Sequence, residues 1–199
     1  GIIFAESSPR KVSFQKALSI RNEIKDKTRV VGVFKNQSLD IIKEYVKELA
    51  LDMVQLHGSE STGMMRQIPV PVIKTLEYDP ATLTLLEPAM LDESVENGFI
   101  LLDKPKNRPT NEKDKALANE KNLEILLSEV KRKRKKVFLA GGLSIIHLET
   151  CFKARDLYAI DLSSSLESKP GVKDPAKIEA FLNSYHFQKK IFKETIPCG

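Results

Sequence analysis

Short apolar runs rich in β-branched residues recur along the chain, and amphipathic stretches separate them. The runs are nearly continuously apolar rather than alternating, which is typical of strands covered on both faces. We therefore predict strands in GIIFA (1–5), RVVGVF (29–34), DMVQLH (52–57), PVIKTL (71–76), FILLD (99–103), KVFLAGG (136–142) and LYAIDLS (157–163).

The amphipathic stretches between these runs predict helices, which we place at 14–24, 38–49, 122–130, 144–152 and 175–182. Ser13 and Ser38 stand where an N-cap side chain would accept a backbone hydrogen bond. Asp174 stands in the same position before Pro175, and proline is favoured at the first position of a helix. These caps fix where three of the helices should begin.

Alternating strands and helices predict a parallel sheet of the α/β class. Two closures are compatible with this order, an open doubly wound sheet and a TIM-type (β/α)8 barrel. Seven β/α units are recognisable, one fewer than the barrel contains. We predict a single domain over 1–184 and a C-terminal tail over 185–199. The stretch 104–121, which has no glycine and many charges, is predicted to be a long loop.

Composition narrows the class of protein. Charged residues make up 30% of the 199 residues, and no apolar run approaches the roughly 18 residues of a membrane helix. The first apolar run is too short for a signal peptide and has no basic residues before it. Cys151 and Cys198 lack partners at metal-ligand spacing, and two thiols fit a reducing cytoplasm. We expect a cytoplasmic protein without a metal ion or a membrane partner.

Much of the net charge of +5 is concentrated in one run of basic residues, 131–136. Such a run can bind nucleic acid, but it can also end a helix, where cations complement the helix dipole. No aromatic residue interleaves with the run to stack on bases. We favour the helix end and expect no nucleic-acid partner.

Ligands of parallel β/α folds bind at the carboxyl ends of the strands, so the residues that follow each run are the first candidates. Arg10 follows the first run in a turn stiffened by proline, and its guanidinium could pair with a carboxylate. Gln55 and His57 lie two residues apart and share a strand face. Asp103 ends an apolar strand, where burial would make it a usable proton donor. The structural alternatives are a surface arginine, a hydrogen-bonded histidine and an aspartate that caps a turn.

Two further turns suggest an anion site. Gly141 and Gly142 expose backbone N–H groups after the sixth run, and Ser163 and Ser164 add hydroxyls after the seventh. This pair of turns matches the phosphate site after strands seven and eight of a β/α barrel. The numbering agrees only if the first run of the chain is strand two.

Taken in order, the motifs GIIFAESSPRKVS, VVGVFKNQSLDII, DMVQLHGSE, PVIKTL, FILLD, FLAGGLS and AIDLSSSLESKPGVKDPAKI resemble those of the phosphoribosylanthranilate isomerase family of tryptophan biosynthesis. The resemblance runs from residue 1 to about residue 182. It implies a (β/α)8 barrel and the cofactor-free Amadori rearrangement of N-(5-phosphoribosyl)anthranilate, an aldose-to-ketose isomerisation. The substrate would be a phosphorylated small molecule.

The resemblance also assigns roles. Asp103 would be the general acid that opens the ribose ring, Arg10 would bind the anthranilate carboxylate, and Gln55 and His57 would contact the substrate. Gly141, Gly142, Ser163 and Ser164 would bind the phosphate. In the family a cysteine on an opening strand of the K-I-C-G-I-T type is the base, and that strand precedes the one that GIIFA resembles.

The sequence departs from the family in three places. The cysteine-bearing first strand is missing or replaced, the stretch 104–121 lacks the usual glycines, and Ser165 stands where glycine is usual. Cys198 in the tail could replace the base, as in a circular permutant, but a frayed tail is the simpler interpretation. The alternatives to an active isomerase are a non-catalytic phosphate-binding barrel and one domain of a bifunctional protein. The partner that we expect is another tryptophan-pathway enzyme, either fused to this chain or associated with it.

Overall fold

The apolar runs form strands in the computed structural model, which describes residues 1–25, 28–79, 82–90, 98–105, 120–131, 135–154 and 157–195. The hydrogen-bonded order of the main sheet is β1-β2-β3-β4-β6-β7-β8, with β5 paired to β4. The chain divides into two units, 1–76 with 89–101 and 77–88 with 102–199. Strands β4 and β6 pass from one unit into the other.

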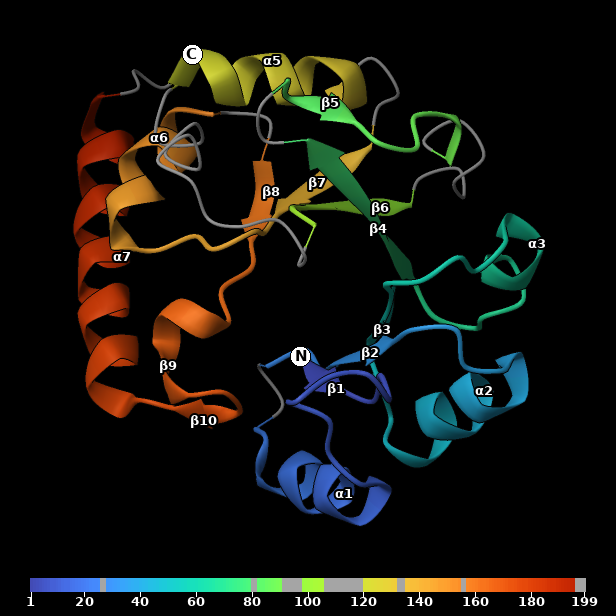
Figure 1. The fold of residues 1–199 in the computed structure, drawn as a ribbon. Coiled ribbons are helices and arrows are strands. Elements are labelled where there is room, and N and C mark those ends of the chain that lie inside the picture. The colour runs from blue at the N-terminus through green and yellow to red at the C-terminus, as the bar shows by residue number, and fades with distance from the viewer. Residues whose placement is uncertain are drawn as a thin grey trace. The chain divides into compact units, whose positions relative to one another are not determined.

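The first unit is built from strand–helix repeats (Figure 1). Its elements are β1 (Ile2–Ile3), α1 (Phe14–Glu23), β2 (Val31–Phe34), α2 (Leu39–Glu48), β3 (Met53–Leu56), α3 (Thr62–Met65), the start of β4 (Val72–Asp79) and the start of β6 (Phe99–Asp103). The pairs β1–β2, β2–β3 and β3–β4 are all parallel. The parallel sheet that the sequence predicted is therefore present here.

Helices α1 and α2 lie on the same side of these strands (Figure 1). Ala17 of α1 and Ile42 of α2 are fully buried against the sheet residues of one hydrophobic core. In that core Phe4 stacks on Phe34 with 5.1 Å between ring centroids, and Tyr45 meets Phe4 edge-on at 4.7 Å. Each such aromatic pair adds about 0.5–1.5 kcal/mol beyond its buried area, so the ring cluster holds α2 on the strands.

The second unit contains the other half of the repeats. Its elements are the ends of β4 and β6, β5 (Thr84–Leu85), α5 (Glu120–Lys131), β7 (Lys136–Leu139), a 3-10 helix (Ile145–His147), α6 (Leu148–Lys153), β8 (Leu157–Ile160), a 3-10 helix (Ser164–Leu166), β9 (Glu167–Lys169), β10 (Val172–Lys173) and α7 (Pro175–Thr195). Strands β7 and β8 pair in parallel, and β9 and β10 form a small antiparallel hairpin. The residues of β6 from 100 to 102 are almost completely buried.

Three predicted helix starts are confirmed by their caps. The hydroxyls of Ser13 and Ser38 accept from the backbone N–H groups of Lys16 and Ile41. Asp174 Oδ1 accepts from Ala176 N at 3.0 Å at the start of α7. Removing such a cap costs about 1 kcal/mol.

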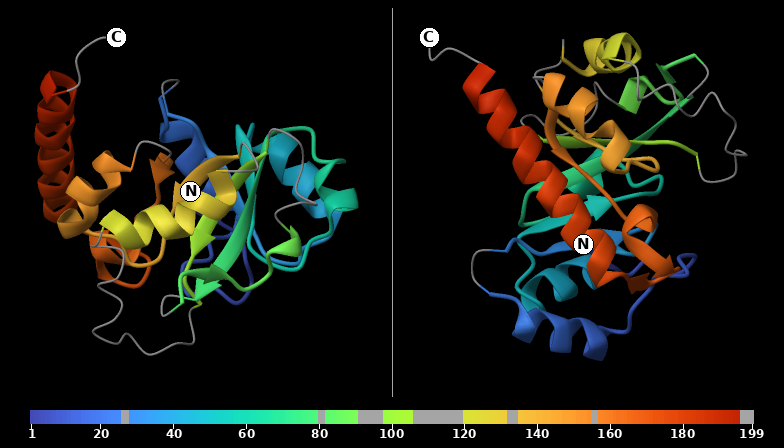
Figure 2. Two further views of the ribbon diagram at one scale, coloured as in Figure 1. Left: turned by 90° about the horizontal axis from the view of Figure 1, so that it is seen from above. Right: turned by 90° about the vertical axis from the view of Figure 1, so that its left-hand side faces the viewer.

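Helix α7 is longer than the sequence predicted, because it continues to Thr195 and includes most of the predicted tail. Its second half packs against α6, where Phe152 contacts Tyr185 at 5.3 Å and stacks on Phe192 at 5.5 Å between ring centroids. Figure 2 shows α7 as one straight helix beside α6. Residues beyond 184 therefore contribute to the packing of the second unit.

Two sequence predictions meet the limits of the described residues. The predicted loop 104–121 lies mostly in 106–119, outside those residues, and Cys198 lies outside them as well. Of the basic run 131–136, Lys131 ends α5 and Lys136 begins β7, while 132–134 lie outside the described residues. No helix within the described ranges is long and apolar enough to cross a membrane.

Candidate functional site

In the second unit, the predicted site residues follow three neighbouring strands. Asp103 ends β6, Gly141 and Gly142 follow β7, and Ser163 follows β8. Backbone hydrogen bonds link these ends, because Ala140 N donates to Leu102 O at 2.8 Å and Asp161 N donates to Leu139 O at 2.7 Å. The acid and both anion-binding turns therefore emerge at one edge of the sheet.

The Gly141–Gly142 turn needs both of its glycines. Their φ angles are +96° and +80°, in the left-handed region that other residues rarely adopt. A Cβ on Gly141 would lie 3.2 Å from Lys104 N and 3.3 Å from Tyr78 Oη. The backbone of this turn is thus packed closely against the end of β6, while Gly142 is exposed.

Asp103 is half-buried, and its Oδ1 accepts a hydrogen bond of 2.8 Å from Lys104 N. The carboxyl group therefore caps the turn after β6, which was the structural alternative for this residue. One oxygen is enough for that cap, so the interaction is compatible with a role for the carboxyl group in proton transfer. That catalytic role stays a prediction.

His147 is a buried residue of this region that the sequence reasoning missed. Ser144 N donates to His147 Nδ1 at 3.1 Å, which closes the first turn after the glycines. Burial lowers the pKa of His147, and the positive charge of Lys104 lowers it further. The spacing Ser-x-x-His after the Gly-Gly pair is the signal that could have identified this cap.

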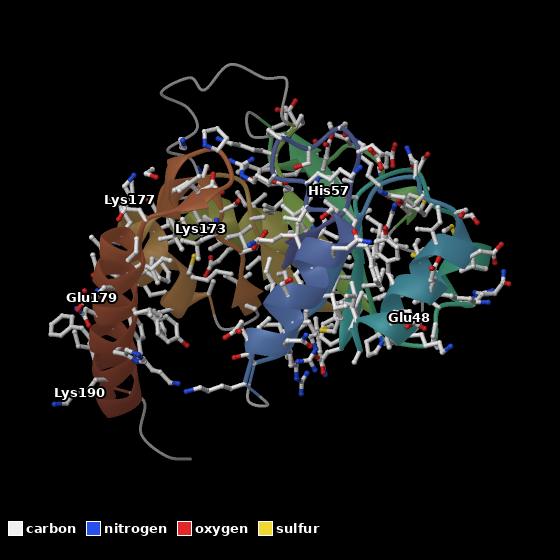
Figure 3. The ribbon with its side chains drawn as sticks, turned by 90° about the horizontal axis from the view of Figure 1, so that it is seen from below. Glu48, His57, Lys173, Lys177, Glu179 and Lys190 are labelled. Carbon is white, nitrogen blue, oxygen red and sulfur yellow. The ribbon has the colours of Figure 1, made fainter. Side chains whose placement is uncertain are left out.

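The serine turn after β8 is fastened to the hairpin that follows it. Lys173 Nζ donates to Ser163 O at 2.9 Å and forms a 3.1 Å ion pair with the buried Glu167. Lys177 Nζ donates to Glu167 O at 2.6 Å. Figure 3 shows Lys173 and Lys177 near the same end of α7, with Lys190 at the other end. Contacts with the β9–β10 hairpin and with α7 therefore hold the serine turn in place.

Ser165, which stands where the resemblance implies a glycine, has a buried hydroxyl with no hydrogen-bond partner among the described residues. An unsatisfied buried polar group costs about 1–3 kcal/mol. We expect Ser165→Ala to raise the free energy of unfolding of the ligand-free protein by about 1 kcal/mol. Urea unfolding followed by circular dichroism measures this change. Ser168→Ala is the matched control, and a loss of stability in the Ser165 variant would contradict the expectation.

In the first unit, Gln55 and His57 lie together as predicted. Gln55 Nε2 lies 3.5 Å from His57 Nδ1 and donates to Thr75 Oγ1 at 3.3 Å. Gln55 is buried on β3, and His57 is half-buried directly after it. The pair is therefore held in place by β4, and its contact with substrate stays a prediction.

A buried ion pair beside these residues was not predicted. Glu60 and Lys74 lie 3.1 Å apart, and their side chains are 1% and 3% exposed. Glu60 also accepts from Asn36 N at 2.8 Å and Gly58 N at 3.0 Å, and Lys74 Nζ donates to Gly58 O. This network, which we call the Glu60–Lys74 tether, joins the turns after β2 and β3 to the middle of β4. A lysine inside an apolar strand was its only sequence signal.

Arg10 lies in the turn after β1, where its backbone N–H donates to Ser8 Oγ at 3.2 Å. The turn is closed by Ser8 N, which donates to Ala5 O at 3.0 Å, and by Lys11 N, which donates to Ser8 O at 3.1 Å. The predicted ordered turn is confirmed. The pairing of the guanidinium with a carboxylate stays a prediction.

Cys151 is the cysteine within the described ranges, and it lies on α6. Burial raises the pKa of its thiol to about 11. At neutral pH this thiol is protonated, so it is unsuited to act as a base. Within the same ranges, no group of three or more His, Cys, Asp or Glu side chains could hold a metal ion.

Comparison with known proteins gives a matching family and related proteins for this chain. The family model described as N-(5'phosphoribosyl)anthranilate (PRA) isomerase matches residues 1–184. A curated N-(5'-phosphoribosyl)anthranilate isomerase of Bacillus cereus (strain G9842) is 33% identical over 182 residues, which cover 92% of this chain and 84% of the relative.

Solved structures agree with this comparison. The phosphoribosyl anthranilate isomerase of Thermotoga maritima is 25% identical and covers 94% of this chain and 87% of its own, with a TM-score of 0.78. A second isomerase structure is in complex with reduced 1-(o-carboxyphenylamino)-1-deoxyribulose 5-phosphate. It is also 25% identical and covers 94% of this chain and 86% of its own, with a TM-score of 0.75. These neighbours support the TIM-type barrel fold with seven recognisable β/α units.

Proposed function

Since the chain belongs to the phosphoribosylanthranilate isomerase family, we propose that it catalyses the Amadori rearrangement of N-(5-phosphoribosyl)anthranilate to 1-(2-carboxyphenylamino)-1-deoxyribulose 5-phosphate. The observation that carries this proposal is the edge of the second unit, where an acid, a Gly-Gly turn and a serine turn follow three neighbouring strands. A phosphorylated aldose needs an anion site that binds its phosphate and an acid that opens its ring.

The proposed roles follow from the chemistry of each group. Backbone N–H groups of Gly141 and Gly142, with the hydroxyls of Ser163 and Ser164, bind the phosphate and so fix the distant ribose ring. Asp103 in its protonated form donates to the ring oxygen and opens the ring to a Schiff base. A base then takes the C2′ proton, a role that a cysteine on an opening strand performs in the family. The resulting enolamine becomes the ketone when C1′ takes up a proton and the 2′-hydroxyl gives one up.

In the first unit, we propose that Arg10 binds the anthranilate carboxylate by two parallel hydrogen bonds, as guanidinium groups do. Gln55 and His57 are proposed to contact the substrate from β3. We do not assign the proton-abstracting base to Cys151, because its raised pKa keeps the thiol protonated. Cytoplasmic location and association with another tryptophan-pathway enzyme stay predictions from the sequence.

The alternative is a phosphate-binding barrel without catalysis, because the Gly141–Gly142 turn and the serine turn could bind a phosphate by themselves. Substrate fluorescence separates the two functions, since it is lost as the isomerase reaction proceeds. We expect turnover by the purified protein, and tight binding of the reduced product analogue seen in the related structure. Binding of the analogue without turnover in either arm of the experiment would contradict the isomerase and support the alternative. A second arm adds a peptide of the family's K-I-C-G-I-T strand type to test rescue.

A further inference from the structure

Among the described residues, Lys104 supplies most of the atoms that side chains on Gly141 and Gly142 would meet. A Cβ on Gly142 would lie 3.3 Å from Lys104 Nζ and 3.4 Å from its Cε. A Cβ on Gly141 would lie 3.3 Å from Lys104 Cγ. The aliphatic stem of the lysine therefore runs along the turn, and its ammonium group reaches the second glycine.

The backbone of Lys104 is fixed at the other end of this arrangement. Its N–H donates to Asp103 Oδ1 at 2.8 Å, and the same nitrogen packs against Gly141. Lys104 is half-buried, so its charge lies where it is screened by water less than a surface charge is. The positive charge also reaches the buried His147 at the far end of the turn, whose pKa it lowers.

We propose that Lys104 is a ligand of the phosphate group at the Gly141–Gly142 turn, in addition to the backbone N–H groups. This inference rests on the proposed function, because it names a further substrate-binding residue of the same site. Glycine N–H groups in left-handed conformations supply only partial charges to an anion. An ammonium group supplies a full charge and three donors, and charge-assisted hydrogen bonds are roughly twice as strong as neutral ones.

The neighbouring serine turn contains one unsatisfied hydroxyl. The hydroxyl of Ser165, one residue after the proposed phosphate-binding serines, is buried and has no partner among the described residues. Buried polar groups normally have a hydrogen-bond partner, so this hydroxyl is an unused donor beside the serine turn. Lysine 104 and the two turns would surround a phosphate with positive charge and donors from β6, β7 and β8.

The test compares Lys104→Met with Lys104→Arg and with the control Lys169→Met, which removes the same charge from an exposed position on β9. The probes are the reduced product analogue and its dephosphorylated form, titrated by calorimetry into each protein. We expect Lys104→Met to lower the affinity for the phosphorylated probe by about 10- to 100-fold, which corresponds to the loss of a hydrogen bond to a charged group. The dephosphorylated probe should bind unchanged, Lys104→Arg should restore most of the affinity, and the control should match the original protein.

Two results would overturn the inference. Either Lys104→Met binds the phosphorylated probe within twofold of the original protein, or it loses affinity equally for both probes, as a structural role would predict. Thermal unfolding of each variant shows whether the fold is kept. The proposed function fails separately, because a protein without turnover can still bind the phosphorylated probe in a Lys104-dependent way. Turnover with Lys104-independent binding would remove this inference and leave the isomerase.

Discussion

Asp103→Asn is expected to reduce turnover of phosphoribosylanthranilate by about 10²- to 10⁴-fold, the contribution of one general acid. An amide cannot donate the proton that opens the ribose ring. The substitution is otherwise conservative, because the amide oxygen can still accept the hydrogen bond that Asp103 Oδ1 receives from Lys104 N. The turn after β6 should therefore keep its shape, and the analogue should bind with similar affinity.

Loss of substrate fluorescence under saturating conditions measures kcat for both proteins. Asp103→Ala is the matched control, since it removes the acid and the cap together and should also loosen the turn beside Gly141. If Asp103→Asn keeps more than a tenth of the original kcat, Asp103 is not the general acid. An equal loss of analogue binding in both variants would assign the residue a structural role instead.

Lys74→Met is expected to destabilise the first unit by about 3–5 kcal/mol, the usual cost of removing one partner of a buried ion pair. The substitution leaves the carboxylate of Glu60, which is 1% exposed, without its compensating charge. It also removes the donor to Gly58 O, so the turn after β3 loses two connections to β4. Urea unfolding gives the change directly. A loss below about 1 kcal/mol, as for a surface pair, would contradict a buried tether.

The double variant Glu60→Leu/Lys74→Met is the control for the charge itself. Replacing a whole buried pair by apolar side chains is often nearly neutral, so this protein should recover much of the stability lost by Lys74→Met. Glu60 accepts hydrogen bonds from the backbone N–H groups of Asn36 and Gly58, and the double variant loses both of them. This loss limits how much stability is recovered.

The pH dependence of stability follows from the same residue. Burial by itself would raise the pKa of Glu60, but hydrogen bonds from backbone N–H groups and the charge of Lys74 outweigh it and leave the pKa below its ordinary value of 4.5. The stabilisation is therefore present above pH 4.5 and is lost as the pH falls through the lowered value. Stability measured from pH 7 downward should decline less steeply in the double variant.

The pattern of apolar positions predicted the strands well, because a buried parallel strand needs a continuous apolar run. Each predicted run contains a strand of the structure. Cap residues such as Ser13 and Asp174 located helix starts for an equally local reason. The four-residue helix α3 and the β9–β10 hairpin were missed, since elements that short carry too little periodicity to detect. The length of α7 was underestimated because the aromatic residues that extend it pack on Phe152, a contact between distant positions.

The candidate site residues divide in the same way, into those that local sequence signals identify and those that depend on tertiary contacts. Those directly after a strand, such as Asp103 and Gly141, could be selected because the carboxyl ends of parallel strands share an edge. Glu60 and Lys74 could not be selected in this way, because their contacts join positions far apart in the sequence. His147 carries a local signal instead, since its partner Ser144 is three residues away. Lys104 was hidden for another reason, since it follows Asp103 at the start of a stretch that composition predicted to be a loop.

The stacking of Phe152 on α7 has a consequence for where this domain can be cut. The family model matches residues only as far as 184, and that boundary would be the natural choice for a shortened protein. Tyr185 and Phe192, the two ring partners of Phe152, lie beyond it. A protein ending at 184 would expose an aromatic ring on α6 to water and to other chains, which favours aggregation. Limited proteolysis of the intact protein should for the same reason spare the helix well past the family boundary.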